Sequence, residues 1–363
     1  MQVNDESGKV TMLADVFQVS PHTLIQRTRL LPLMGRVLVS LGDPVQAQDV
    51  VAEAILPAKT VSLDGCRGLG LSEEEIKECM LSKPGDILKK GDLIAQREGT
   101  VSRVLRAPED GTLIDVSRGK VLLGTDTTIV QVQAGLAGIV TDVFPELGVC
   151  LQAEGGLVQG VWGNGRCGSG PLSMPSVISD GESAGTDQIR ESLLPGNVLA
   201  IEHCNNVDLL EKIMAVGMAG LICGTLAPGL IPLATSWDQP VVVLQGFEQQ
   251  PVDPVSWEFS VSRIGTVASI NASPTDLWQG ERPEVLFPNE GGEPEKVLPF
   301  RVELAAGQRV RILAGPAVGR TGKIVALGEE TEFESGLRYP TTTVQLREGD
   351  RMTVPQQNLA VLG

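Results

Sequence analysis

The residues Gly42-Asp43-Pro44-Val45, followed by Asp49-Val50-Val51-Ala52, set a pattern that the chain repeats. The second copy is Gly85-Asp86-Ile87-Leu88, followed by Asp92-Leu93-Ile94-Ala95. Each copy holds a Gly-Asp pair, an apolar position, a short spacer, a second aspartate, two apolar residues and an alanine. A Gly-Asp turn between short apolar strands is typical of a β hairpin. The repeat therefore predicts two hairpin-like halves that close into one small β sandwich within residues 31–130.

Residues 107–113, Ala-Pro-Glu-Asp-Gly-Thr-Leu, follow the second copy. Together with that copy they resemble the barrel-sandwich hybrid fold of biotinyl and lipoyl carrier domains. The resemblance implies the fold, whereas the carrier function also needs an attachment lysine in a Met-Lys-Met or Asp-Lys-Ala setting. The corresponding stretch, residues 53–59, ends in Pro57-Ala58-Lys59 and matches neither pattern. We therefore expect Lys59 to be a solvated lysine and the chain to carry no cofactor.

The composition restricts the kinds of partner. At 363 residues the chain is long enough for about two to four domains, and its apolar fraction of 42% suits a globular protein. The formal net charge of −16 repels nucleic acid and anionic membranes, so any phosphate contact requires a local basic patch. Aromatic residues make up only 3%, which leaves few platforms for base stacking.

Cysteine and histidine usage argues against a metal site and for a reducing compartment. The six cysteines form no Cys-x-x-Cys pair, and there are only two histidines, so no zinc site is expected. The start of the chain shows no basic, apolar signal pattern, which predicts a cytoplasmic protein. Residues 213–234 carry no charge, but glycines and prolines divide them. This stretch predicts a helix end, a buried strand and a turn rather than a membrane span.

A glycine loop follows an apolar strand in the region 131–180, for which we expect a β-rich connector. Residues 163–168 match Gly-x-Gly-x-x-Gly, but Pro171 and Pro175 prevent the helix that a dinucleotide site needs directly afterwards. Two interpretations remain open for the loop. It is either a plain tight turn or an anion-binding nest, whose ligand-binding residues would be Gly163, Gly165, Arg166 and Gly168.

Residues 181–278 show the pattern of a small α/β module with a parallel sheet. The apolar stretches 198–201, 220–224 and 240–244 predict buried strands, and Asn206 is placed to cap a helix after the first of them. Ligands bind beyond the carboxyl ends of parallel strands. His203, Cys204 and Cys223 are therefore the candidate catalytic residues, as a Cys-His nucleophile pair. The alternative is that they only fill the edge of the sheet.

The last segment, residues 301–363, follows a Pro-, Gly- and Glu-rich stretch at 279–300 that predicts a linker. Gly307-Gln308-Arg309-Val310-Arg311-Ile312 and the glycines after it resemble a KOW motif, which occurs in transcription factors of the NusG type and in a ribosomal protein. The resemblance implies an SH3-like barrel that contacts RNA or protein. The partner- or RNA-binding candidates, which can form a basic face, are Arg309, Arg311, Arg320 and Lys323.

The predicted fold is thus a multidomain, mainly β chain with one small α/β module. In order, it has an N-terminal arm (1–30), a barrel-sandwich hybrid (31–130), a β-rich connector (131–180), an α/β module (181–278), a linker (279–300) and an SH3-like barrel (301–363).

Three functional hypotheses are compatible with this organisation. The leading one is a non-enzymatic modular binding or assembly protein that acts through protein partners. The second is an RNA-, ribosome- or transcription-associated factor, and the third is an enzyme that uses the His/Cys cluster. No membrane partner is expected. Exposed sheet edges would also favour a homo-oligomer.

Overall fold

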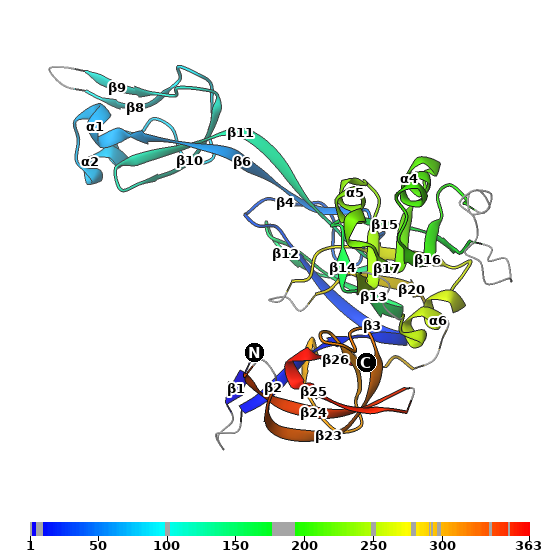
Figure 1. The fold of residues 1–363 in the computed structure, drawn as a ribbon. Helices are drawn as coiled ribbons and strands as arrows, with labels where there is room; N and C mark the ends of the chain where they lie inside the picture. Colours follow the sequence, from blue (N-terminus) through cyan, green and yellow to red (C-terminus); the bar gives the residue numbers. More distant parts are fainter. Residues whose placement is uncertain are drawn as a thin grey trace.

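A computed structural model describes residues 2–4, 10–98, 102–175, 193–247, 252–276, 281–289, 291, 293–295, 299–333, 336–347 and 349–363 (Figure 1). The described chain is mainly β, with several sheets and a few short helices, as predicted for a mainly β multidomain protein. Figure 1 shows a small tip lobe that a two-stranded ribbon carries away from a central body. A terminal unit on the other side of the body contains both chain ends.

The ribbon consists of β6 (Val50–Asp64) and β11 (Lys120–Gln133), which pair antiparallel along their length. At its far end lies the tip lobe, whose buried core includes Leu88, Ile94 and Leu113. Ser72 is the N-cap of helix α2 and forms a capping box with Glu75. The elements of the lobe are α1 (Gly65–Leu69), α2 (Glu73–Glu78), β7 (Ile87–Leu88), β8 (Leu93–Arg97), β9 (Arg103–Arg106) and β10 (Gly111–Ser117).

The two copies of the repeat do not close into one sandwich, which corrects our expectation. In the first copy, β5 (Pro44–Val45) pairs with β12 (Gly138–Phe144), and Val45 is buried in the body. In the second copy, β7 pairs with β10, and Leu88 is buried in the tip lobe. The length of the ribbon separates the two cores, so each copy has its own partner segment.

The copies nevertheless share one local structure. In each turn, the aspartate side chain accepts a hydrogen bond from the backbone amide three residues earlier, at 2.7–2.8 Å. Such a bond stabilises a turn because it satisfies an amide that the turn leaves unpaired. Gly42, Gly85 and Gly91 have φ near +90°, where a side chain would be strained. The four aspartates are Asp43, Asp49, Asp86 and Asp92.

The tip lobe is inserted into the hairpin of the first copy. In the second copy, a hairpin of β8 and β9 begins after Asp92 and ends before Ala107, whose amide donates to the Asp92 carbonyl at 2.9 Å. In the first copy, the ribbon begins after Asp49 and ends before Ala134, whose amide donates to the Asp49 carbonyl at 2.8 Å. The ribbon of the first copy therefore occupies the position that the β8–β9 hairpin has in the second copy. The second copy lies within the first, so the repeat is nested rather than tandem.

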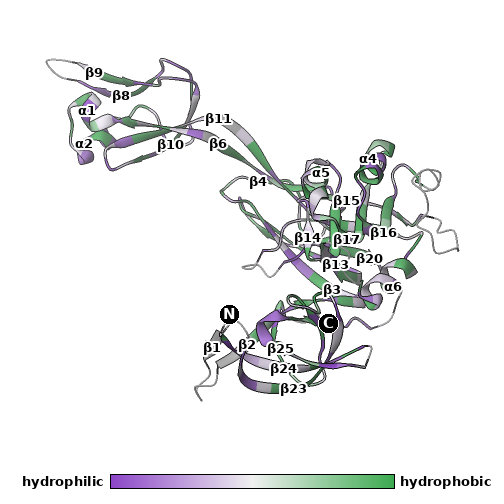
Figure 2. Ribbon diagram, in the orientation of Figure 1, coloured by the Kyte–Doolittle hydropathy of each residue, from purple (hydrophilic) through white to green (hydrophobic). Residues whose placement is uncertain are grey.

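The body combines the β-rich connector and the α/β module in one large sheet. As predicted, β16 (Val198–Cys204), β17 (Gly220–Leu226) and β18 (Val241–Phe247) are parallel, and Figure 2 shows hydrophobic residues along β16 and β17. Asn206 caps α4 (Val207–Val216), which packs on one face of these strands with α5 (Ile231–Ser236). Helix α6 (Pro254–Ser262) packs on the other face. The remaining elements are β3 (Val19–Leu30), β4 (Arg36–Val37), β13 (Gly148–Gln159), β14 (Trp162–Gly163), β15 (Cys167–Ser173), η1 (Pro228–Leu230), β19 (Val267–Asn271) and β20 (Glu284–Pro288).

The uncharged stretch 213–234 divides as predicted into the end of α4, the buried strand β17, η1 and the start of α5. Within the part of the chain that the structure describes, no helix has the length and apolar character needed to cross a membrane.

The predicted linker contains a core strand instead. β20 lies between β19 and β13, and Val285 and Phe287 are buried. Two of the glutamates that suggested a linker form ion pairs with arginines of β3. Glu284 pairs with Arg27 at 2.5 Å, and Glu281 pairs with Arg29 at 2.7 Å.

The terminal unit includes the start of the chain, so the expected boundaries shift. β2 (Val10–Phe17) pairs with β21 (Arg301–Glu303) and β26 (Leu359–Leu362), and Ala14 and Val16 are buried in the core of this unit. An N-terminal arm at 1–30 is therefore divided between the terminal unit and β3 of the body. The other elements are β1 (Gln2–Asn4), β22 (Arg309–Ile312), β23 (Thr321–Glu332), β24 (Arg338–Leu346), β25 (Arg351–Pro355) and η2 (Gln356–Asn358).

Candidate binding groove between the terminal unit and helix α6

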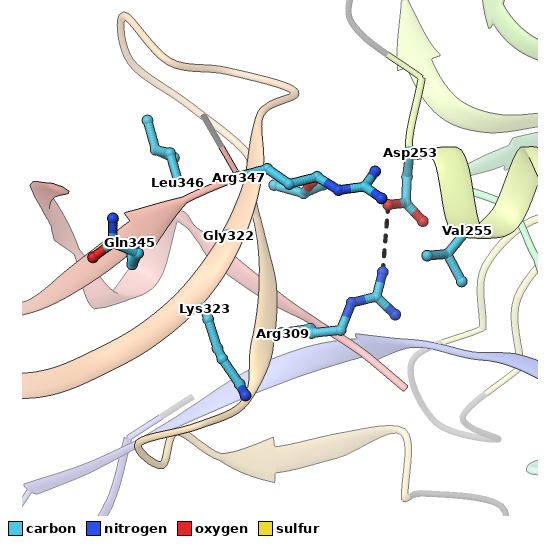
Figure 3. A pocket seen from close by; sticks show the side chains of 9 residues that line it. Asp253, Val255, Arg309, Gly322, Lys323, Gln345, Leu346 and Arg347 are labelled. Atoms are coloured by element: carbon cyan, nitrogen blue, oxygen red, sulfur yellow. Dashed lines mark hydrogen bonds and ion pairs between the residues drawn. The ribbon is translucent and has the colours of Figure 1, made fainter. Parts of the chain in front are cut away.

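A groove runs between the terminal unit and the start of α6 (Figure 3). It comprises two adjoining cavities of about 280 and 330 Å³. Thr321, at the start of β23, and Leu346 and Arg347, at the end of β24, line both. These residues meet because β23 and β24 are antiparallel, and the Arg347 amide donates to the Thr321 carbonyl at 3.3 Å. The groove thus lies at the base of the β23–β24 hairpin.

The described residues that line the groove are strongly biased toward positive charge. Arg309, Lys323 and Arg347 line the first cavity, and Arg320 and Arg347 line the second. The one acidic side chain among them is Asp253. Figure 3 shows the guanidinium groups of Arg309 and Arg347 directed toward it. Among the described lining residues of the first cavity, three cations therefore accompany one carboxylate.

Asp253 has a structural role that occupies its carboxylate. Its side chain is only 2% exposed and caps α6 by accepting from the Ser256 amide at 3.1 Å. Its other oxygen lies 3.4 Å from Nη2 of Arg309. Because the cap satisfies the helix amide, the attraction of this groove for an anion comes from the side-chain cations of the terminal unit.

Arg311 does not belong to the exposed basic face that we predicted. It is 3% exposed, and its Nη1 donates to the carbonyls of Leu244 and Gln245 at 3.5 and 3.4 Å. Burial lowers the pKa of Arg311 to about 10, against the opposing effect of the Asp253 charge. This residue anchors the terminal unit to β18 because the terminal unit packs against the body at this point.

Three of the four basic candidates thus line one groove. The sequence reasoning missed Arg347 and Asp253. Arg347 becomes apparent only once the register of β23 and β24 is known, whereas Asp253-Pro254 is a recognisable helix start.

Arg282 joins the body to the terminal unit. Its guanidinium stacks between the rings of Phe17 and Phe300, with centroids at 4.2 and 4.1 Å. Its Nε donates to the Val16 carbonyl at 3.1 Å, and Asp15 lies 3.2 Å from its Nη2. These contacts hold β2 and Phe300 against Arg282 of the body.

The His/Cys candidates do not assemble into a nucleophile pair. His203 contacts Thr225 at 2.8 Å, while Cys204 and Cys223 are buried in the core beneath α4 and α5. Burial raises the pKa of Cys204 to about 12 and that of Cys223 well above its usual value. Both thiols are therefore protonated at neutral pH, which opposes nucleophilic reactivity.

The glycine loop has the geometry of a tight turn. The Asn164 and Gly165 amides donate to the carbonyls of Val241 and Ala272, so neither is available to an anion. A side chain at Gly163 would begin 2.2 Å from the Ala272 carbonyl, which explains that glycine. Gly168 belongs to β15 and pairs with Ile270 of β19, and Arg166 is exposed and lies 3.3 Å from Asp238.

Lys59 lies within the ribbon strand β6 and 3.3 Å from Glu109, rather than at the tip of a hairpin. The described residues contain no group of three or more His, Cys, Asp and Glu side chains arranged to hold a metal ion. No protein-family model and no curated protein sequence matches this chain.

Proposed function

We propose that this chain is a non-enzymatic modular binding protein that assembles with protein partners, and that the groove receives an acidic segment of a partner. The observation that carries the proposal is the charge of the groove. Arg309, Lys323 and Arg347 line it together with a single carboxylate, Asp253, that already caps a helix. An acidic peptide would supply the missing negative charge, and electrostatic complementarity of this kind favours specificity and fast association.

The lining favours an acidic protein segment over RNA, which is the second candidate. The described lining residues include no aromatic side chain on which a base would stack. The whole chain carries a formal charge of −16, which opposes a long polyanion more than a short acidic segment. Because the groove is basic and the segment resembles a KOW motif, binding of RNA phosphates is the alternative, and the test below includes it.

The arrangement of the modules also supports an assembly role. The ribbon presents the tip lobe far from the groove (Figure 1), so the two surfaces suit two different contacts. On the ribbon, Ile55 and Ile129 face each other across the strands and are 61% and 63% exposed. Exposed apolar side chains of this kind occur at protein contact sites. All six cysteines are free, which suits a reducing compartment such as the cytoplasm.

The test compares a fluorescent Glu-rich peptide with an oligouridine of equal charge by fluorescence anisotropy. In the double variant Lys323→Glu and Arg347→Glu, we expect peptide affinity to fall by at least about tenfold, or about 1.4 kcal/mol. The matched control reverses Lys89 and Lys90, which are exposed in the tip lobe, and should retain the affinity. Peptide binding that is equal in both variants would exclude the groove. Tighter binding of the oligouridine, lost in the groove variant, would favour the RNA candidate.

A further inference from the structure

The β23–β24 hairpin carries opposite charges at its two ends. At its base, Lys323 and Arg347 are exposed and line the groove. Toward its far end, Glu329, Glu330 and Glu332 are exposed. The far-end ion pair, between Glu332 and Arg338 at 3.5 Å, involves side chains that are 61% and 70% exposed, so it contributes little. The hairpin is therefore an elongated element with a basic end and an acidic end.

The acidic end cannot serve the groove of its own chain. Lys323 and Glu330 lie on the same strand, and a strand rises by about 3.3 Å per residue, so about 20 Å separates them. Pairing with β24 on both sides of the bulges keeps the strand extended. The complementary ends can thus meet only between two molecules.

Exposed apolar side chains lie between the charged ends. Val325 is 41% exposed and Leu327 is 48% exposed, and both belong to β23. Protein contact surfaces commonly have an apolar centre and a polar rim, and apolar residues flanked by charges of opposite sign match this composition. The hairpin therefore has an apolar centre and two ends of opposite charge.

We propose that two copies of this chain pair through their β23–β24 hairpins in an antiparallel arrangement about a twofold axis. The acidic end of each copy then lies against the basic groove of the other, and Val325 and Leu327 meet near the axis. The same contact forms twice, so the assembly closes as a dimer. The inference rests on the proposed function only in that both use the groove as a binding surface.

The experiment is sedimentation velocity of the full-length chain. Variant A carries Lys323→Glu and Arg347→Glu, and variant B carries Glu329→Lys and Glu330→Lys. We expect a dimer for the original chain and a monomer for each variant alone, because each reversal places like charges against each other in both contacts. An equimolar mixture of A and B should restore the dimer, since both contacts then join opposite charges. Circular dichroism verifies folding, and the Lys89→Glu, Lys90→Glu chain should remain a dimer.

Several outcomes would overturn the inference. They are a monomeric original chain, variants that remain dimeric, or a mixture of A and B that stays monomeric. The peptide assay separates this failure from that of the proposed function. If the original chain is monomeric but its groove still binds the Glu-rich peptide, only the dimer is excluded. If A and B restore the dimer while no acidic peptide binds, the groove serves self-association and the proposal of a foreign acidic partner fails.

Discussion

Glu284 shows how single residues in the body combine burial with charge. Its side chain is 2% exposed, and its two oxygens accept from Nε and Nη2 of Arg27 at 2.8 and 2.5 Å. Burial opposes the charged form, but the charge and hydrogen bonds of Arg27 outweigh it and hold the pKa of Glu284 below its usual value. Bidentate pairs of this kind combine strength with fixed geometry. The pair therefore fixes β3 relative to β20.

Replacing Glu284 by glutamine should lower the free energy of unfolding by about 3 kcal/mol at pH 7, because Arg27 is left as a buried, unbalanced charge. A depressed carboxyl pKa stabilises the fold above the pKa of the unfolded chain, and this contribution is lost as pH falls through the folded pKa. The difference in unfolding free energy between the original chain and the variant should therefore shrink below about pH 4.5. Urea unfolding, followed by tryptophan fluorescence at several pH values, measures this difference in unfolding free energy. Glu332→Gln, in an exposed pair, should change stability by less than about 0.5 kcal/mol.

The turns of the nested repeat determine stability at the scale of an element. Asp86 and Asp92 each accept a backbone amide hydrogen bond within the tip lobe. Replacing either by alanine should destabilise the lobe by about 1 kcal/mol and speed its amide exchange about fivefold. Hydrogen–deuterium exchange with mass spectrometry should show the change in the tip lobe and none in β16 to β18. Asp115→Ala, at an exposed position in β10, is the control, and equal acceleration there would contradict a specific role for the turns.

Local patterns predicted elements better than the contacts between them. The capping residue Asn206 correctly predicted a helix because a cap depends only on neighbouring backbone. The partners of the repeated turns could not be predicted, since β5 and β7 are each two residues long and pair with distant segments. Arg311 was misplaced for a related reason. Its burial depends on how the terminal unit packs on the body, which a local charge pattern does not contain.

At the scale of the whole molecule, the tip lobe should fold without the rest of the chain. All the residues of its core cluster lie between Val61 and Leu123. We expect residues 59–125, expressed alone, to unfold cooperatively by circular dichroism.

Conversely, Leu56 and Thr128 are register partners, so an Asn-Gly turn between them can replace residues 57–127. The shortened chain should keep its melting temperature within about 3 °C. A large loss would show that the lobe and body depend on each other.

The nested repeat also has a mechanical consequence. Both strands of the ribbon are continuous covalent chains from the body to the tip lobe. A pull on the lobe along the ribbon axis is therefore borne by two polypeptide backbones side by side, and no hydrogen bond has to break for the load to be carried. Bending and torsion meet only the low stiffness of two paired strands. The arm thus acts as a tether that is strong in tension and compliant sideways, which lets a load on the lobe change direction without loosening either core.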